Sequence, residues 1–435
     1  MSATQRPKVL MIAYACNPEG TGEHWLGWGW AEQAAANYQV HLLTTPNARD
    51  AVERHAQRLG IRPRFVSLPR PVRALTEPFG PFGSWTRKML WAFRAARAAE
   101  TWHRQERFAL VHQTTFHTFR VPFLAATRLN IPSVWGPIAG GEYIPLGFYK
   151  YLGALYAPES MRRVFNGLWF AMPPIQRALE CADVIFVSNH VTQRFLGPRF
   201  AGKSRIVPPN AIRPEDATAP GLARRRATSE SFRLLYVGNC LPTRAMPLVF
   251  DALARTGFDD YELTIIGDGL GLKLWRREAR RHRVAERVKF LGPLPHAQLA
   301  THYEQADVFV FPGLRDSGGS ALLEAMSKGL PVVCLDWAGP SEIVDEHSGV
   351  KVPVTTPEET VLAFARALVR LRNEPDWRVA LGQRAAERAR ALFTWQAKRA
   401  LLEETYARLL TSPPKAPPVE REGRPPPHET TLPDG

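Results

Sequence analysis

Short apolar runs alternate along the chain with longer stretches in which apolar residues recur at helical spacing. This alternation of strand and helix is typical of a parallel sheet covered by helices. In the first half of the chain, strands are predicted at residues 8–14, 40–45, 64–69, 108–113, 131–136 and 183–188. The first half is therefore predicted to be one doubly wound α/β unit.

A second series of apolar runs repeats the pattern after a stretch, 205–231, that is rich in Pro, Ala and charged residues. Its predicted strands lie at residues 232–238, 261–267, 287–292, 307–312, 330–335 and 349–354. Ligands of such sheets bind beyond the carboxyl ends of the strands, so two α/β halves that face each other would bind them in the cleft between. The predicted division is a first domain over 1–212, a linker over 213–231, a second domain over 232–394, a helix over 395–411 that returns towards the first domain, and a disordered Pro-rich tail over 412–435.

Glycines gather where the predicted strands end, at 20–22, 238, 267–271, 292 and 317–319. Glycine lets a ligand approach the backbone, and a helix that begins there offers free N–H groups to a phosphate. The alternative is that these loops need glycine only for tight turns. The chain has no GxxxxGK[ST] motif, and no GxGxxG opens its first helix, which argues against a P-loop ATPase and a simple dehydrogenase.

Two carboxylates stand out in the stretch LRDSGGSALLEAMSKGLPVV, which begins at Leu314. Asp316 precedes a double glycine, and Glu324 follows eight residues later in a predicted helix, which spans about 12 Å. This distance matches the reach from a sugar across a diphosphate to a ribose. A simpler interpretation is a surface pair between Glu324 and Lys328, with Asp316 or Ser317 as a helix cap.

The second half of the chain, through LTIIGDG, RVKFLGPL and HYEQADVFVFPGLRDSGGSALLEAMSKGLPVVCLDW, resembles the glycosyltransferase family 4 group. That family has the GT-B fold, in which two Rossmann-like doubly wound domains face each other across a cleft. The first half is similar to it through YACNPEGTGEHWLGWGWA, VHQTTFHTFRVP and VWGPIAGGE. These segments look like a branch that builds bacterial surface polysaccharides. The resemblance implies an acceptor domain followed by a nucleotide-sugar donor domain.

The family's signature is an acid, seven residues and a glutamate, which here spans Asp316 to Glu324. By resemblance, Asp316 and the loop Ser317, Gly318 and Gly319 hold the hydroxyls of the donor sugar, and Glu324 binds the ribose. Asp316 stands where the family usually has glutamate, so its side chain is shorter by one methylene. The resemblance therefore leaves the identity of the donor sugar open.

The family also places two cations after the glycine that ends the first strand of the donor domain, and both bind the diphosphate. Here Gly238 is followed by Asn239 at the first of these places and by Arg244 at the second. Arg244 can bind a phosphate bidentately, whereas Asn239 carries no charge. The resemblance thus implies a diphosphate site with Gly238, Asn239 and Arg244, in which Arg244 and Asp316 act in catalysis.

For the first domain, the resemblance implies that Gly22 contacts the diphosphate through its N–H group and that Glu23 is a candidate acceptor base. The family usually has a histidine near the donor sugar, after the strand that ends in IPSVWG here, and this chain has none at that place. His24, His112 and His117 are candidate substitutes, although each could equally be a hydrogen-bonded structural histidine.

The implied activity is transfer of a sugar from a nucleotide-sugar to a saccharide acceptor, which could be lipid-linked, with retention of anomeric configuration. The enzyme would act by positioning and by stabilising phosphate charge, without a metal ion or cofactor. Two other functions stay open. One is a nucleotide-sugar epimerase, and the other is a non-catalytic nucleotide-sugar-binding subunit.

The net charge of +15 indicates an anionic partner, and the sequence contains no nucleic-acid-binding module. The predicted helix 85–108 carries Trp91 and Trp102 on one stripe and arginines beside it, and 148–172 adds aromatic and basic residues. These stretches could form a surface for anionic lipid, or the tryptophans could be core. Scattered cysteines and the lack of a signal peptide or spanning segment favour a cytoplasmic protein, peripheral on the inner face of the membrane.

Overall fold

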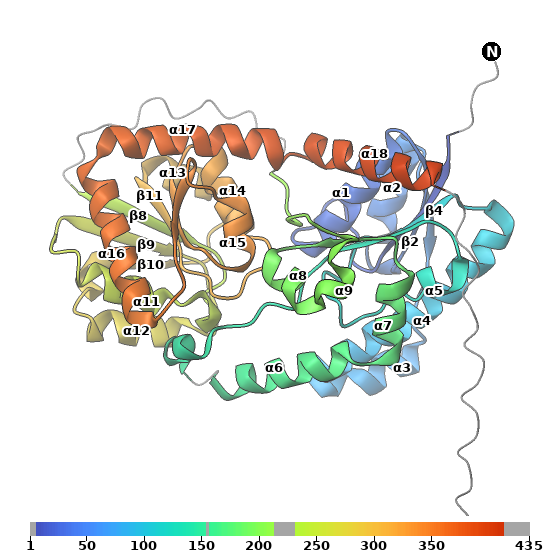
Figure 1. Ribbon diagram of the computed structural model, residues 1–435, viewed down its shortest axis with the longest axis horizontal. Helices are drawn as coiled ribbons and strands as arrows, with labels where there is room; N and C mark the ends of the chain where they lie inside the picture. Colours follow the sequence, from blue (N-terminus) through green and yellow to red (C-terminus); the bar gives the residue numbers. More distant parts are fainter. Residues whose placement is uncertain (1–5, 154–155, 213–230, 413–435) are drawn as a thin grey trace, which may run out of the picture.

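The computed structural model describes residues 6–153, 156–212 and 231–412. Its two domains lie side by side (Figure 1). The first domain contains a seven-stranded parallel sheet in the order β3-β2-β1-β4-β5-β6-β7. These strands are β1 Lys8–Ala13, β2 Gln39–Thr44, β3 Arg62–Phe65, β4 Leu110–Gln113, β5 Ser133–Ile138, β6 Val184–Val187 and β7 Ser204–Ile206. The central strands are buried along nearly their whole length, as expected for a parallel sheet covered on both faces.

The second domain contains a six-stranded parallel sheet in the order β10-β9-β8-β11-β12-β13. These strands are β8 Phe232–Val237, β9 Tyr261–Ile266, β10 Val288–Gly292, β11 Val308–Phe311, β12 Val332–Leu335 and β13 Gly349–Val352. In both sheets the chain starts in the middle, builds outwards on one side and then returns to the other side. The order of strands therefore reverses between β1 and β4 and between β8 and β11, which is where doubly wound sheets bind ligands.

Helices cover the faces of both sheets. In the first domain these are α1 Glu23–Ala35, α2 Arg49–Leu59, α3 Arg70–Thr76, α4 Gly80–Glu106, α5 Ala126–Leu129, α6 Tyr156–Phe170, α7 Pro173–Cys181, α8 His190–Leu196 and α9 Pro198–Ala201. The helices of the second domain are α11 Met246–Leu253, α12 Leu272–Arg281, α13 His296–Gln305, α14 Ser320–Ser327, α15 Ala338–Ile343, α16 Pro357–Asn373 and α17 Pro375–Leu392. The prediction of two doubly wound α/β domains is confirmed.

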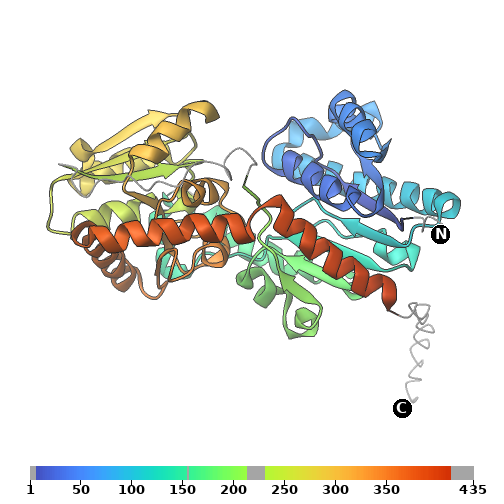
Figure 2. The same cartoon turned by 90° about the horizontal axis from the view of Figure 1, so that it is seen from above.

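The last helix, α18 Trp395–Thr411, lies on the first domain, although the chain reaches it directly from α17 in the second (Figure 2). Its indole at Trp395 packs edge-to-face on Trp30 of α1, with ring centroids 5.9 Å apart. Tyr406, further along α18, is buried in the same core. The bounds of α18 agree with the helix predicted at 395–411.

A second segment crosses between the domains earlier in the chain. The 3₁₀ helix η3, Leu146–Tyr151, belongs to the first domain by sequence position. Its side chains Phe148 and Tyr151 are nevertheless buried in the core of the second domain, together with Ile144 and Leu152. The predicted first domain, 1–212, therefore contributes an arm to its partner domain before α6 returns.

One strand of the first sheet was not predicted from the sequence. β7, Ser204–Ile206, lies within the predicted first domain and pairs with β6 at the edge of the sheet. Its three residues give too short a pattern to signal a strand. Residues 213–230 of the predicted linker, and the predicted disordered tail beyond Ser412, lie outside the described residues.

The tryptophan stripe of α4 does not form a membrane surface. Trp91 is 1% exposed and Trp102 is 6% exposed, and both belong to the core of the first domain. The indole N–H of Trp91 donates to the carbonyl oxygen of Val66 at 2.9 Å. The alternative interpretation, in which this stripe is core, is therefore correct, because the stripe faces the sheet.

Candidate active site

A cleft of about 570 Å³ lies between the two domains, at the carboxyl ends of the central strands of both sheets. Loops after β1 and β4 line it from the first domain, and loops after β8 and β11 line it from the second. Predicted site residues that line it are Gly22, Glu23, His117, Gly238, Asn239, Arg244, Asp316, Ser317, Gly318, Gly319 and Glu324. The structure thus gathers, in one place, residues that are up to 302 positions apart in the sequence.

The loop that carries Asp316 is held in a tight turn by its own side chain. Oδ1 of Asp316 accepts hydrogen bonds from the N–H groups of Gly318 and Gly319, at 2.7 and 2.9 Å. Gly319 adopts a φ of 60°, which favours glycine, and α14 begins at the next residue. The carbonyl oxygen of Asp316 accepts from the N–H of Gly339 at 2.8 Å. Asp316 is therefore fixed in place before any ligand binds.

Neighbouring residues press closely against this loop. A Cβ atom added at Gly318 would come within 2.5 Å of the side-chain nitrogen of Asn210, in the stretch that connects the domains. A Cβ added at Gly339 would come within 2.8 Å of the carbonyl oxygen of Asp316. Both glycines are therefore needed so that the loop can lie against its surroundings.

Arg244 lies at the end of the short 3₁₀ helix η5, Pro242–Arg244, which follows β8. Its guanidinium contacts the carboxylate of Asp316 as an ion pair. Nη1 makes this contact, whereas the buried Nε has no hydrogen-bond acceptor within the described chain. Burial also lowers the pKa of this guanidinium from its usual value. Buried donors that lack acceptors are costly, so this side chain is well suited to an anionic ligand in the cleft.

Glu324 lies on the face of α14 that is turned to the cleft, while Leu322, Leu323 and Met326 are buried on the other face, as the helical spacing predicts. The hydroxyl of Tyr303 donates to Oε2 of Glu324 at 3.1 Å. Nε2 of His296 lies 3.6 Å from Oε1 of the same carboxylate. Glu324 is thus oriented by two side chains of the preceding helix, α13.

Tyr303 and His296 were missed by reasoning from the sequence. Both lie in or next to the stretch that carries the family resemblance, but neither belongs to the spaced signature of Asp316 and Glu324. Their contact with Glu324 depends on how α13 packs beside α14. No regular spacing between the three residues signals that packing, so the sequence alone offered no clue to it.

The first domain brings two polar side chains to the cleft. Oε1 of Glu23 and Nε2 of His117 are buried and have no hydrogen-bond partner among the residues described. Burial lowers the pKa of His117, and the charge of Glu23 opposes that shift. These two groups are therefore available to a substrate that enters from the first domain.

The other two candidate histidines lie elsewhere. His24 is exposed, although its neighbour Glu23 lines the cleft. His112 is fully buried on β4, where Nδ1 contacts the hydroxyl of Tyr406 at 2.6 Å and Nε2 contacts the carbonyl oxygen of Gly136 at 2.8 Å. Burial lowers the pKa of His112 to about 4, so it is neutral at physiological pH. His112 joins α18 to the sheet and does not reach the cleft.

Two family models match the chain, one for each domain. The model described as "Glycosyl transferase 4-like domain" matches residues 25–210, and the one described as "Glycosyl transferases group 1" matches residues 223–388. Each match contains the residues by which its own domain lines the cleft, except Gly22 and Glu23, which come before residue 25. The two halves of the cleft therefore belong to the parts of the chain that the two models describe.

Similar proteins include a D-inositol 3-phosphate glycosyltransferase from Kineococcus radiotolerans, which is 27% identical over 411 residues, 87% of this chain and 92% of that protein. A GDP-mannose-dependent alpha-(1-6)-phosphatidylinositol monomannoside mannosyltransferase from Mycobacterium tuberculosis is 28% identical over 257 residues, 54% of this chain and 66% of that protein. Among solved structures, a sucrose-phosphate synthase from Thermosynechococcus elongatus has a TM-score of 0.59 at 21% identity, covering 93% of this chain and 99% of that one. The structural likeness concerns the fold alone.

Proposed function

We propose that this chain, which belongs to the family 4 glycosyltransferases of GT-B fold, moves a sugar from a nucleotide-sugar donor to a saccharide acceptor and retains the configuration at the anomeric carbon. One observation carries the proposal of a donor site. The cleft contains a buried arginine whose Nε donor has no acceptor in the described chain and whose Nη1 pairs with a carboxylate that the neighbouring loop fixes. This arrangement suits a donor with a diphosphate and sugar hydroxyls.

In this proposal the donor lies along the second domain. Arg244 binds the diphosphate, with Gly238 and Asn239 beside it, Asp316 accepts hydrogen bonds from hydroxyls of the sugar, and Glu324 accepts them from the ribose. Asp316 and Glu324 line the same cleft at either end of the segment 316–324, as this assignment requires. Gly22, at the start of α1, offers its N–H group from the first domain.

Catalysis would rest on positioning and on charge. As the bond to the anomeric carbon breaks, negative charge grows on the diphosphate, and Arg244 is placed to stabilise it. The departing diphosphate would take the proton of the acceptor hydroxyl on the same face of the sugar, which gives retention. Glu23 and His117 would hold the acceptor. Because Arg244 and backbone N–H groups supply the positive potential, we propose that no metal ion is required.

A donor screen tests this function most directly. Turnover of UDP-, GDP- and dTDP-sugars is measured with saccharide and lipid-linked acceptors, each with and without EDTA, and the anomeric configuration of the product is read by NMR. We expect one donor class to be consumed only with acceptor, equally in EDTA, and with retention. Isomerised donor without acceptor would indicate an epimerase, and donor binding without any transfer would indicate a binding subunit.

We also propose that the acceptor is lipid-linked, in the synthesis of a polysaccharide or glycoconjugate at the inner face of the cytoplasmic membrane. Support comes from α6, whose Met161, Val164, Phe165 and Leu168 are 56, 65, 44 and 61% exposed. Their spacing places all four on one face of the helix. No helix in the described part of the chain is long and apolar enough to cross a bilayer. An exposed apolar face of this kind suits a helix that lies in a membrane surface.

Helix α4, which contacts α6, carries exposed basic groups that favour an anionic bilayer. Trp169 of α6 packs edge-to-face on Trp85 of α4, with ring centroids 5.2 Å apart. Arg94 and Arg97 are exposed on α4, on the same side of that helix as the exposed Leu90 and Phe93. Basic and apolar groups together bind anionic lipid surfaces.

A charge placed on the apolar face of α6 should weaken membrane binding. The double variant F165E/L168E is expected to reduce co-sedimentation with phosphatidylglycerol vesicles by about tenfold or more, because two apolar side chains leave the bilayer and two negative charges face it. Leu392→Glu, at an exposed leucine at the end of α17, serves as the matched control and should change nothing. Equal sedimentation of wild type and double variant would contradict this surface.

A further inference from the structure

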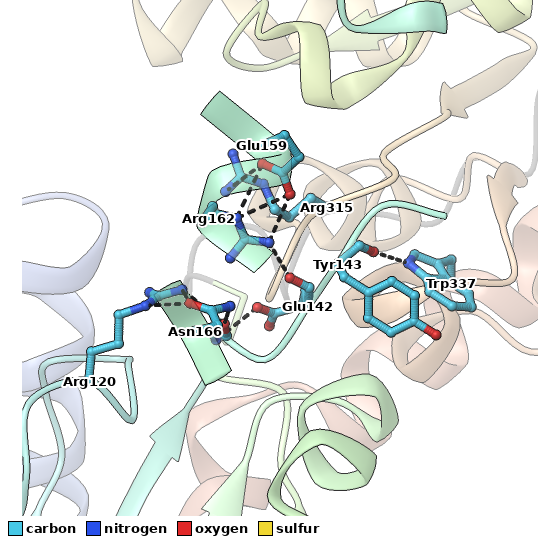
Figure 3. Close-up of polar contacts among 9 residues, drawn as sticks. Arg120, Glu142, Tyr143, Glu159, Arg162, Asn166, Arg315 and Trp337 are labelled. Carbon is cyan, nitrogen blue, oxygen red and sulfur yellow. Dashed lines mark hydrogen bonds and ion pairs between the residues drawn. The ribbon is translucent and has the colours of Figure 1, made fainter. Parts of the chain in front are cut away.

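The side of α6 opposite its exposed apolar face carries a buried carboxylate, Glu159. Its side chain is only 5% exposed and lies between two guanidinium groups (Figure 3). Arg162, one turn further along α6, donates from Nη2 to Oε1 of Glu159 at 2.9 Å. Nη1 of Arg315 lies 3.5 Å from Oε2 of Glu159. Both oxygens of this carboxylate therefore face a positive charge.

The two arginines belong to different domains. Arg162 and Glu159 are on α6 of the first domain, whereas Arg315 is on the loop after β11 in the second, directly before Asp316. The contact between Glu159 and Arg315 therefore joins α6 to the loop of the donor site across the domain boundary. A shift of the Arg315 side chain would act on the neighbouring Asp316 through a single peptide unit.

Other contacts fix α6 firmly on its own domain, so that Glu159 presents a fixed position. Oδ1 of Asn166 accepts from Nε of Arg120 at 2.8 Å, and Nδ2 of Asn166 donates to the carbonyl oxygen of Gly140 at 2.9 Å. Nη2 of Arg162 also donates to the carbonyl oxygen of Glu142. The loop of Arg315 is therefore tied to a helix that is itself fixed to the first domain.

The balance of charge explains why a carboxylate is needed there. Burial lowers the pKa of Arg315, and the positive charge of Arg162 lowers it further, while Glu159 and Glu142 oppose both effects. The carboxylate of Glu142 already accepts from the N–H of Gly140 and from Asn189, at 2.8 Å each. Without Glu159, the charges of Arg162 and Arg315 would repel each other in a partly buried place.

We propose that Glu159 is a positioning residue for the donor site, which holds Arg315 and through it the loop that carries Asp316. This role deepens the proposed function and rests on it. Glu159 contacts no donor atom itself. It makes donor binding in the second domain depend on α6 of the first domain, the same helix whose outer face is proposed to meet the membrane.

The test measures binding of UDP and of GDP by isothermal titration calorimetry, for wild type, Glu159→Gln, Arg315→Gln and the double variant. Wild type should bind one of the two nucleotides. Glu159→Gln is expected to weaken that binding by about tenfold, because repulsion displaces Arg315, and with it Asp316 and its partner Arg244. The double variant should recover most of the loss, because removing both charges removes the repulsion. Recovery of this kind is not expected from a general loss of structure.

Glu180→Gln provides the matched control, since Glu180 pairs with Arg199 on the surface of the first domain. Equal affinity of wild type and Glu159→Gln would overturn the positioning role and leave the proposed function intact. Tighter binding in Glu159→Gln would overturn it too, because Glu159 would then withhold Arg315 from the phosphates. If wild type binds neither UDP nor GDP, the four proteins are compared with dTDP instead, and if it binds none of the three nucleotides, the proposed function itself fails. If Glu159→Gln does not fold, the nucleotide affinity of Arg315→Gln is compared with that of wild type instead. The Arg315 side chain is 30% exposed, so its replacement disturbs the fold less.

Discussion

Arg244→Gln is expected to lower kcat/KM for the nucleotide-sugar by about 100- to 1,000-fold, which corresponds to roughly 3–4 kcal/mol of transition-state stabilisation. Among the described residues that line the cleft, Arg244 is the only lysine or arginine. The family usually has a second cation beside it, but Asn239 stands there in this chain. In the proposed mechanism, stabilisation of the charge that develops on the diphosphate therefore depends on this one guanidinium.

The measurement is steady-state turnover with the donor found in the screen, at several donor concentrations. Arg244→Lys should retain more activity than Arg244→Gln but less than wild type, since it keeps the charge and loses the bidentate geometry. Arg384→Gln, at an exposed arginine of α17, is the matched control and should leave turnover unchanged. Activity within about threefold of wild type in Arg244→Gln would contradict the diphosphate assignment, because a buried charged donor normally contributes far more.

Most of the fold could be predicted from the sequence because its strands are buried and apolar. β8, with the pattern FRLLYV, and β11, with VFVF, lie within one or two residues of their predicted bounds. The edge strand β7 could not be predicted, since only three residues, SRI, pair with a single neighbour. The strength of the pattern follows from burial on both faces, which an edge strand lacks.

The sequence left the packing of helices open where burial depends on a partner far away in the sequence. The stripe of Trp91 and Trp102 has the same spacing whether it meets lipid or the sheet, and packing decided for the sheet. Phe148 and Tyr151 belong to a first-domain segment but fill the core of the second domain. The helical spacing gave no information about the element on which these side chains pack.

The family resemblance placed Asp316 and Glu324 in one site, and both line the cleft, whereas their spacing alone also fitted a surface pair and a helix cap. The site was not predictable where neighbours come from other elements. Tyr303 reaches Glu324 from α13, and Glu159 reaches Arg315 from the other domain. Such contacts depend on tertiary packing, which leaves no regular interval in the sequence.

Asp316→Asn is expected to lower kcat/KM by about 100-fold while the loop keeps its shape. The asparagine oxygen can still accept from the N–H groups of Gly318 and Gly319, so the turn before α14 should survive. The charge beside Arg244 is lost, however, and one oxygen that could accept from a sugar hydroxyl becomes a nitrogen that donates. The loss of turnover should therefore far exceed what the change in the temperature of unfolding explains, although the lost ion pair with buried Arg244 lowers that temperature.

Asp316→Glu separates the shape of the loop from its charge. The added methylene moves the carboxylate away from the two glycine N–H groups, while the negative charge near Arg244 remains. If the shorter side chain helps to select the donor sugar, the ratio of kcat/KM between two sugars on the same nucleotide should change in Asp316→Glu by about tenfold. Asp336→Asn, at an aspartate that pairs with Lys351, is the matched control. Full activity of Asp316→Asn on the same donor would overturn the assignment of Asp316, because a carboxylate that binds the sugar cannot be replaced by an amide without loss.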